Sequence, residues 1–251
     1  MTLEILAMHG WAGDSRAWAP WRELARERGW SWTCGERGYG ALPPVQPVWS
    51  ASGPAKRVAI GHSLGPHLLP PEVLAGADAV VLLASFAAFL PGGRAERSLR
   101  RGLAGMAAPL EAYLEAHEHE AAAAEHPSAA AVRTMLKAFL AKAADPAPAA
   151  ALPPGPEADP LTAAGCRRLL EDLHRLEASA GLPEGFPSAA TVLVVEAEAD
   201  RIVVPEAREQ LRRALPDAAV LTLPGVGHSL LESAVLARVV GWLERFEAGD
   251  G

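Results

Sequence analysis

Short runs of apolar residues, each bounded by turn-forming residues, recur near both ends of the chain. These runs cover residues 3–10, 56–63, 77–85, 190–200 and 218–228. Their length and nearly continuous apolar character are typical of strands buried on both faces of a sheet. Amphipathic segments at 14–29, capped by Asp14 or Ser15, and at 205–215, opened by Pro205, predict helices. Strands that alternate with helices predict an α/β protein with a mostly parallel, helix-covered sheet.

The middle of the chain has a different pattern, because residues 92–188 contain no convincing strand. Alanine-rich stretches instead predict helices at 106–125, 128–144 and 160–179. A segment dense in proline and alanine at 144–160 predicts an extended, mobile linker. We therefore expect a core formed by residues 1–91 and 189–251, with a helical insertion over residues 92–188.

Composition narrows the class of protein. The chain has 251 residues, of which 50% are hydrophobic, and a formal net charge of -7. This balance favours a soluble globular protein and argues against general binding to nucleic acid or to an anionic membrane. The two cysteines cannot build a disulfide framework, and the first residues, MTLEILAMHGW, lack the pattern of a secretory signal. No apolar run is long enough to span a membrane, so we expect a cytoplasmic protein.

The sequence GHSLG, residues 61–65, stands at the end of one of the apolar runs. A serine between two glycines at this point matches the G-x-S-x-G nucleophile elbow, in which a strained strand-to-helix turn presents the serine side chain. Pro66 fits the first turn of the following helix, while Pro70 and Pro71 predict that this helix is short. Ser63 is therefore the candidate nucleophile.

An alcohol is a poor nucleophile at neutral pH, so a serine of this kind needs an adjacent base. Asp200 lies just beyond one predicted strand and His228 beyond the last one, which gives the chain order Ser, Asp, His that accompanies the elbow. His228 is expected to take the serine proton, and Asp200 to fix the imidazole tautomer. Glu196 and Glu198 are weaker candidates for the acid because they belong to the strand itself.

Acyl transfer also needs backbone N–H groups that bind the oxyanion. Leu64, the residue after the nucleophile, would supply the first of these groups. The amide of Trp11, in the loop HGWAGD after the first apolar run, is the candidate for the second, with its indole as one wall of the pocket. A purely structural role of Trp11 is the alternative. Three histidines of the helical middle fit no zinc pattern and are interpreted as solvated residues: His117, His119 and His126.

The motifs HGW, ERGYG, GHSLG, VLVVEAEADRIVVP and PGVGHS resemble those of the α/β-hydrolase family, in the same order and over nearly the whole chain. This resemblance implies the fold of that family, a strand before ERGYG, a lid formed by residues 92–188, and serine hydrolysis without metal or cofactor. The chain departs from the family between ERGYG and KRVAIGHS, where a short proline-rich segment replaces a full helix.

Within the family, the likeness is strongest to the pimeloyl-[acyl-carrier protein] methyl ester esterases of biotin synthesis. LEAYLEAHE resembles their substrate-lining lid helix, which implies that Tyr113 lines the acyl site. AAVRTMLKA resembles the helix that binds the carrier protein, which implies docking by Arg133 and Lys137. CRRLLEDLHRLEAS resembles the helix that leads back to the core.

The two basic residues of that second segment lie one helical turn apart and would face the same way. They could meet an acidic carrier helix, and a solvated helix face is the alternative. A second cluster could extend the basic rim, with simple solvation as its alternative: Arg94, Arg97, Arg100 and Arg101.

The function expected from these observations is that of a carboxylic-ester hydrolase that acts on small esters, with no cofactor or metal. The resemblance further implies demethylation of a pimeloyl methyl ester carried by the acyl-carrier protein. Two alternatives on the same fold are a carbon–carbon bond hydrolase or lyase, and a general small-ester esterase or thioesterase. A ligand-binding protein that has lost turnover is the least favoured alternative.

Overall fold

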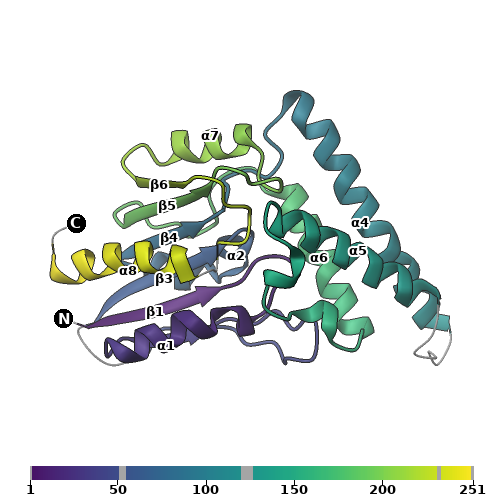
Figure 1. Cartoon of the computed structure of the whole chain (residues 1–251), viewed down its shortest axis with the longest axis horizontal. Coiled ribbons are helices and arrows are strands. Elements are labelled where there is room, and N and C mark those ends of the chain that lie inside the picture. Colours follow the sequence, from purple (N-terminus) through teal and green to yellow (C-terminus); the bar gives the residue numbers. More distant parts are fainter. Residues whose placement is uncertain (1, 51–54, 120–126, 231–232, 250–251) are drawn as a thin grey trace.

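The computed structural model describes residues 2–50, 55–119, 127–230 and 233–249. One sheet of six strands forms its centre, in the order β2-β1-β3-β4-β5-β6 (Figure 1). The strands are β1 Leu3–Met8, β2 Ser31–Cys34, β3 Lys56–His62, β4 Ala79–Leu83, β5 Thr191–Ala197 and β6 Ala219–Leu223. Every neighbouring pair is parallel. The predicted parallel sheet is therefore confirmed.

The position of each strand in the sheet determines how deeply its residues are buried. All residues of β1 and β4 are buried, because they lie inside the sheet between helix-covered faces. The edge strands β2 and β6 are largely exposed. The run at 218–228 therefore does contain a strand, as predicted, but the expected burial on both faces is wrong because this strand lies at the edge of the sheet. The four-residue strand β2, with the sequence SWTC, has no apolar run of its own, and only the family resemblance implied a strand before ERGYG.

Helices of the core cover the two faces of the sheet. Ala19–Glu27 (α1) and Ser233–Ala248 (α8) pack on the face that carries Leu3 and Ile5. The opposite face, which carries Leu6, is covered by three helices: α2 Gly65–Leu68, α3 Pro71–Ala75 and α7 Pro205–Ala214. The helix predicted at 14–29 is divided into a 3-10 turn, η1 Ser15–Trp18, and α1. Asp14 caps the turn by accepting a hydrogen bond from the Arg16 N–H at 2.8 Å.

Residues 92–188, here called the helical segment, join β4 to β5. Its described helices are α4 Gly93–His119, α5 Pro127–Ala144 and α6 Ala163–Ala178. Helix α4 begins earlier than predicted, since the arginine-rich stretch after Gly93 is also helical. The proline-rich linker contains two 3-10 turns, η2 Ala149–Ala151 and η3 Pro156–Ala158, and is less extended than expected. The end of the helix predicted at 106–125 and His126 lie outside the described residues.

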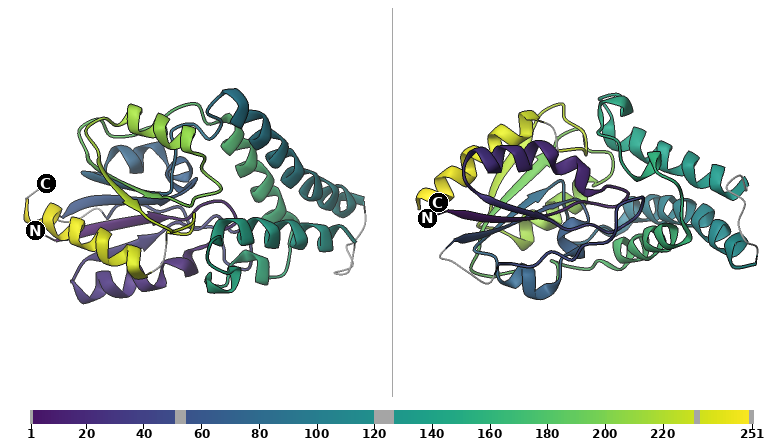
Figure 2. Two further views of the ribbon diagram at one scale, coloured as in Figure 1. Left: turned by 45° about the horizontal axis from the view of Figure 1, so that its top comes forward. Right: turned by 90° about the horizontal axis from the view of Figure 1, so that it is seen from below.

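The helical segment forms a lobe beside the sheet, on the side away from the two termini (Figures 1 and 2). Its buried side chains belong to the same hydrophobic cluster as the α2, α3 and α7 face of the core. Whether this lobe acts as a lid stays a prediction. No helix in the described ranges is both long and apolar enough to cross a membrane.

Candidate active site

Ser63 occupies a strained turn between β3 and α2. Its φ of 55° lies in the left-handed region, which is unfavourable for a residue with a side chain. Two hydrogen bonds from the end of β4 hold this conformation. The Ser63 N–H donates to the Leu83 carbonyl at 2.8 Å, and the Ser85 hydroxyl donates to the Ser63 carbonyl at 2.7 Å. The neighbouring strand therefore supports the geometry that the GHSLG motif predicted.

Two glycines allow the loop after β1 to approach the serine closely. A Cβ on Gly65 would lie 2.3 Å from the Met8 carbonyl oxygen, at the end of β1. A Cβ on Gly10 would lie 2.9 Å from the Ser63 Cβ. Both distances are too short for a side chain, so these residues are glycine because backbone segments meet here. The approach places the loop that contains Trp11 beside Ser63.

His228 and Asp200 form a buried pair. The His228 Nδ1 and the Asp200 Oδ2 are 2.8 Å apart, and the two residues are 2% and 8% exposed. Burial alone would raise the pKa of Asp200, but His228 and the N–H groups of Val203 and Ile202 hold this pKa below its usual value. The carboxylate is therefore charged at neutral pH, and Nδ1 carries the proton of the imidazole. This arrangement leaves the Nε2 of His228 available to accept a proton.

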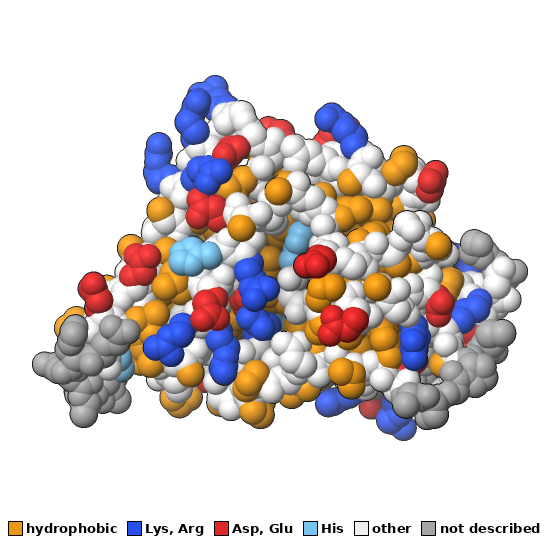
Figure 3. Space-filling model, turned by 180° about the vertical axis from the view of Figure 1, so that it is seen from behind, with side chains coloured by type: hydrophobic (Ala, Val, Ile, Leu, Met, Phe, Trp, Pro, Cys, Tyr) orange, Lys and Arg blue, Asp and Glu red, His pale blue; other side chains and the backbone are white. Residues whose placement is uncertain are grey.

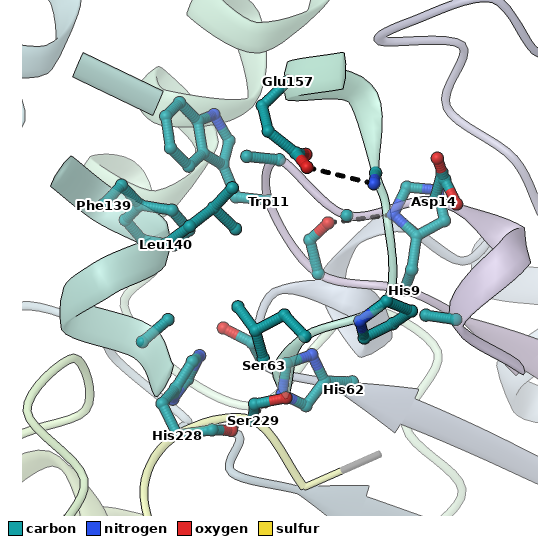
Figure 4. Close-up of a pocket in the computed structure, with 18 of the residues that line it drawn as sticks. His9, Trp11, Asp14, His62, Ser63, Phe139, Leu140, Glu157, His228 and Ser229 are labelled. Atoms are coloured by element: carbon teal, nitrogen blue, oxygen red, sulfur yellow. Dashed lines mark hydrogen bonds between the residues drawn. The ribbon is translucent and has the colours of Figure 1, made fainter. Parts of the chain in front are cut away.

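Ser63 and His228 line the same small cavity of about 80 Å³. Figure 4 shows them on one side of this cavity, with Trp11 and Phe139 on the other. Among the described residues, no hydrogen bond joins Ser63 to His228. Such a bond is often long before substrate binds, so the shared cavity is the relevant observation.

The backbone N–H groups of Trp11 and Leu64 donate no hydrogen bond to another group of the described chain. Trp11 lines the small cavity, whereas Leu64 is 0% exposed and is not among the described residues that line it. The Trp11 indole is held separately. Its Nε1 donates to the Leu169 carbonyl of α6 at 2.8 Å, and its ring packs edge-on against Phe139 of α5 at 4.8 Å between centroids. The indole thus lines the cavity, as predicted, and also links the loop after β1 to the helical segment.

Comparison with known proteins shows which fold the chain has. A family model described as TAP-like protein matches residues 175–246, which include Asp200 and His228. A thermophilic esterase from Thermogutta terrifontis is 16% identical, covers 98% of this chain and 91% of its own, and has a TM-score of 0.62. A Burkholderia ambifaria protein with the α/β hydrolase fold is 18% identical, with coverages of 98% and 91% and a TM-score of 0.58. The chain has the α/β-hydrolase fold.

A third similar structure is an esterase from Exiguobacterium antarcticum, which is 12% identical, covers 96% of this chain and 92% of its own, and has a TM-score of 0.59. No curated protein matches the chain. Identities of this size show the α/β-hydrolase fold and do not identify the substrate.

The sequence indicated no role for a second histidine of this α/β-hydrolase fold, His62. The Nε2 of His62 lies 3.0 Å from the His228 carbonyl oxygen, and the two rings are 5.0 Å apart. Burial, together with the neighbouring His228, lowers the pKa of His62 to about 3. The His62 ring is therefore neutral and donates its Nε2 proton to that carbonyl. The position of His62, directly before Ser63, was the only sequence signal for this support.

The C-terminal end of α5 also supports the loop that carries His228, here called the histidine loop. The Ser229 N–H donates to the Ala143 carbonyl at 3.2 Å. A Cβ on Gly227 would lie 2.1 Å from the Asp145 carbonyl oxygen, so the two backbones are in direct contact. The helical segment of this α/β-hydrolase fold is therefore packed against the residues that precede and follow His228.

A second, larger cavity of about 430 Å³ opens between α4 and α5. It shares Trp11, Ser63 and Phe139 with the small cavity. Most of its other lining side chains are apolar and include Leu99, Leu103, Met106, Met135 and Leu176. The candidate nucleophile thus stands where an apolar cavity meets a small one.

The structure does not bring Tyr113 to this site. Tyr113 is 4% exposed, stacks on His117 at 3.8 Å between ring centroids, and lies 3.4 Å through its hydroxyl from the Leu161 carbonyl. It does not line either cavity among the described residues. His117 is less solvated than predicted, because it is half-buried and packs on Tyr113, one turn earlier on α4.

The predicted docking residues differ in their surroundings. Arg133 is partly buried and donates to the Asp159 carbonyl at 3.2 Å, so it binds the segment at η3, whereas Lys137 is exposed. Arg94 and Arg97 are also exposed, and Figure 3 shows basic side chains projecting where α4 begins. Arg100 instead pairs with Glu96 and Glu177.

Proposed function

We propose that the protein is a serine-dependent carboxylic-ester hydrolase. The observation that carries this proposal is that Ser63, on its strained turn, and His228, of the buried Asp200–His228 pair, line one small cavity. A nucleophile, a base and a group that orients the base are the three parts that such catalysis needs. The esterases among the structurally similar proteins support the same class of reaction.

In the first half of the proposed reaction, the Ser63 hydroxyl oxygen attacks the carbonyl carbon of the ester, and its proton moves to the Nε2 of His228. Asp200 stabilises the imidazolium that forms and stays ionised. The oxyanion accepts hydrogen bonds from the N–H groups of Trp11 and Leu64. The intermediate then collapses, the carbon–oxygen bond to the alcohol breaks, and the alcohol takes the proton from His228.

In the second half, water attacks the carbonyl carbon of the acyl-enzyme and gives its proton to His228. The bond to the Ser63 oxygen breaks as that oxygen recovers the proton. The carboxylic acid leaves, and the free enzyme is restored. The complete reaction therefore consumes only the ester and one water molecule.

Replacing Ser63 with alanine tests the mechanism. We expect Ser63→Ala to fold like the parent and to lose turnover of p-nitrophenyl esters by a factor on the order of a million. A phosphonate that labels active serines should add its mass to the parent chain and not to the variant. Retention of most activity by a folded Ser63→Ala protein would show that another group is the nucleophile.

As the specific substrate, we propose the methyl ester of a pimeloyl group carried by the acyl-carrier protein. The resemblance of the helical segment, the apolar cavity beside Ser63 and the exposed basic residues of α4 and α5 support it. The contact of Arg133 with the η3 segment makes Lys137, Arg94 and Arg97 the better candidates for carrier binding. A cytosolic location stays a prediction that rests on the cysteine content.

The carrier proposal is tested by following loss of the methyl group by mass spectrometry. Reversing Lys137, Arg94 and Arg97 to glutamate should slow demethylation of the carrier-bound ester and leave a free methyl ester of the same acid unaffected. Equal losses on both esters would contradict carrier binding at these residues. Hydrolysis of aryl esters without any demethylation would keep the serine mechanism and remove this substrate.

A further inference from the structure

Two glycines of α4 have no structural explanation within the packing of the chain. Gly102 and Gly105 lie inside a 27-residue helix, where glycine is less favourable than every residue except proline. A Cβ at either position would meet no atom within 4 Å, so no neighbour approaches too closely for a side chain. Neither glycine has a positive φ. Helix geometry and packing would therefore both accept a larger residue here.

Both glycines line the larger cavity, beside Leu99, Leu103 and Met106 of the same helix. Met135, Ala138 and Phe139 of α5 line the opposite side. The two helices diverge toward the sheet, as the views of Figures 1 and 2 agree. Both glycines are exposed where the cavity opens to solvent, so a larger side chain at either position would be added at the wall of this space, whose volume of about 430 Å³ is in the range of small-molecule sites.

The cavity also reaches the candidate nucleophile. Ser63 lines it and is only 6% exposed, and no hydrogen bond of its hydroxyl is found among the described residues. The only charged residue among the described residues that line the cavity is Lys142, which is exposed at the end of α5. An uncharged, apolar chain attached to a carbonyl group at Ser63 fits this lining better than a charged or strongly polar one.

We propose that Gly102 and Gly105 are specificity-determining residues, which keep the cavity open for a linear apolar acyl chain of the ester. This inference rests on the proposed function, because it requires that Ser63 receives the acyl group. Burial of each additional CH₂ group should raise kcat/KM about fourfold until the chain fills the cavity. A leucine side chain at either position would take the place of several CH₂ groups of the substrate.

The test compares Gly102→Leu and Gly105→Leu with the parent on p-nitrophenyl esters of increasing acyl length. The parent should prefer the longer chains. Each variant should lose kcat/KM for these chains by a factor on the order of a hundred, with the acetyl ester changed less than about threefold. Thermal midpoints should not fall, because leucine is a better helix former than glycine.

Ala104→Leu is the matched control, since Ala104 is exposed on the same helix and does not line the cavity. It should keep the chain-length profile of the parent. The inference is overturned if the glycine variants keep that profile too, or if they lose activity on all esters equally.

A binding measurement separates this inference from the hydrolase proposal. Calorimetric titration with decanoate should show binding to the parent and to Ser63→Ala, and weakened binding to Gly105→Leu. Absence of ester turnover with this pattern of binding would overturn the proposed hydrolysis and retain the apolar-chain site. Turnover of the acetyl ester without decanoate binding and without a chain-length preference would overturn the site and retain the hydrolase.

Discussion

Asp172→Asn tests how much one buried carboxylate, which joins the helical segment to the core, contributes to the free energy of unfolding. Asp172, in α6, is 0% exposed and accepts hydrogen bonds from residues of the ERGYG motif after β2. The Arg37 Nε donates to Oδ2 at 2.8 Å, and the Arg37 Nη2 donates to Oδ1 at 2.9 Å. The Tyr39 hydroxyl donates to Oδ2 at 2.6 Å. One carboxylate therefore joins two distant parts of the chain.

The expected cost follows from the donors that surround this carboxylate. Asparagine keeps one oxygen and places an NH₂ group where the other oxygen was, so at least one N–H of Arg37 faces a donor. The guanidinium also loses its counter-charge. Breaking a buried ion pair by removing one partner costs about 3–5 kcal/mol. Because the Arg37 side chain is 15% exposed, water can reach part of it, and we expect a loss of about 3 kcal/mol in the free energy of unfolding.

Urea unfolding at pH 7 measures this loss against two controls. Arg175→Ala removes an ion pair to the same carboxylate, but its side chain is 58% exposed, so the expected loss is below about 1 kcal/mol. Tyr39→Phe removes one hydrogen bond to a charged acceptor and should cost about 1.5 kcal/mol. If Asp172→Asn cost no more than Arg175→Ala, the reasoning from the buried pair would be refuted.

Two further substitutions address the supports of the histidine loop. Gly227→Ala would place a Cβ 2.1 Å from the Asp145 carbonyl oxygen and push the loop from the end of α5, so kcat on a short ester should fall on the order of a hundredfold. His62 has a pKa of about 3 in the folded chain against about 6.5 when unfolded, so unfolded chains bind more protons between these values. Its contribution to stability is present above about pH 6.5 and falls by about 1.4 kcal/mol per pH unit on acidification toward pH 3, as urea titrations at several pH values should show. His62→Asn should remove this slope. Unchanged kcat in Gly227→Ala, or an unchanged slope in His62→Asn, would contradict these roles.

The central part of the fold could be predicted from the sequence because buried parallel strands carry continuous apolar runs. The carboxyl ends of such strands meet at one edge of the sheet, which is why Ser63, Asp200 and His228 could be named together without a structure. The contact between Asp200 and His228 is now observed, and the catalytic roles of the three residues stay predictions. Strand β2 lacked a pattern because it is only four residues long and carries polar residues at an exposed edge, whereas the equally exposed edge strand β6 has the apolar sequence AVLTL and was predicted.

The details of the helical segment could not be predicted in this way. An alanine-rich pattern identifies a helix but does not determine which face meets a neighbour, because alanine fits both buried and exposed positions. Tyr113 packs on the next turn of α4, and Arg133 binds a backbone carbonyl of the η3 segment. Both contacts depend on how α4, α5 and the linker pack together. The cavity itself forms only where these elements pack together, so no sequence motif predicts it.

The arrangement separates the groups that would perform the reaction from those that would select the acyl chain. The turn at Ser63 and the Asp200–His228 pair stand at the ends of the strands, and their hydrogen-bond partners belong to the sheet and its loops. Gly102 and Gly105 lie on α4, which contributes none of those partners. Substitutions on α4 should therefore change which ester is preferred while the shape of the pH profile of kcat stays the same. A shifted pH profile in the glycine variants would show that the two sets of residues are coupled.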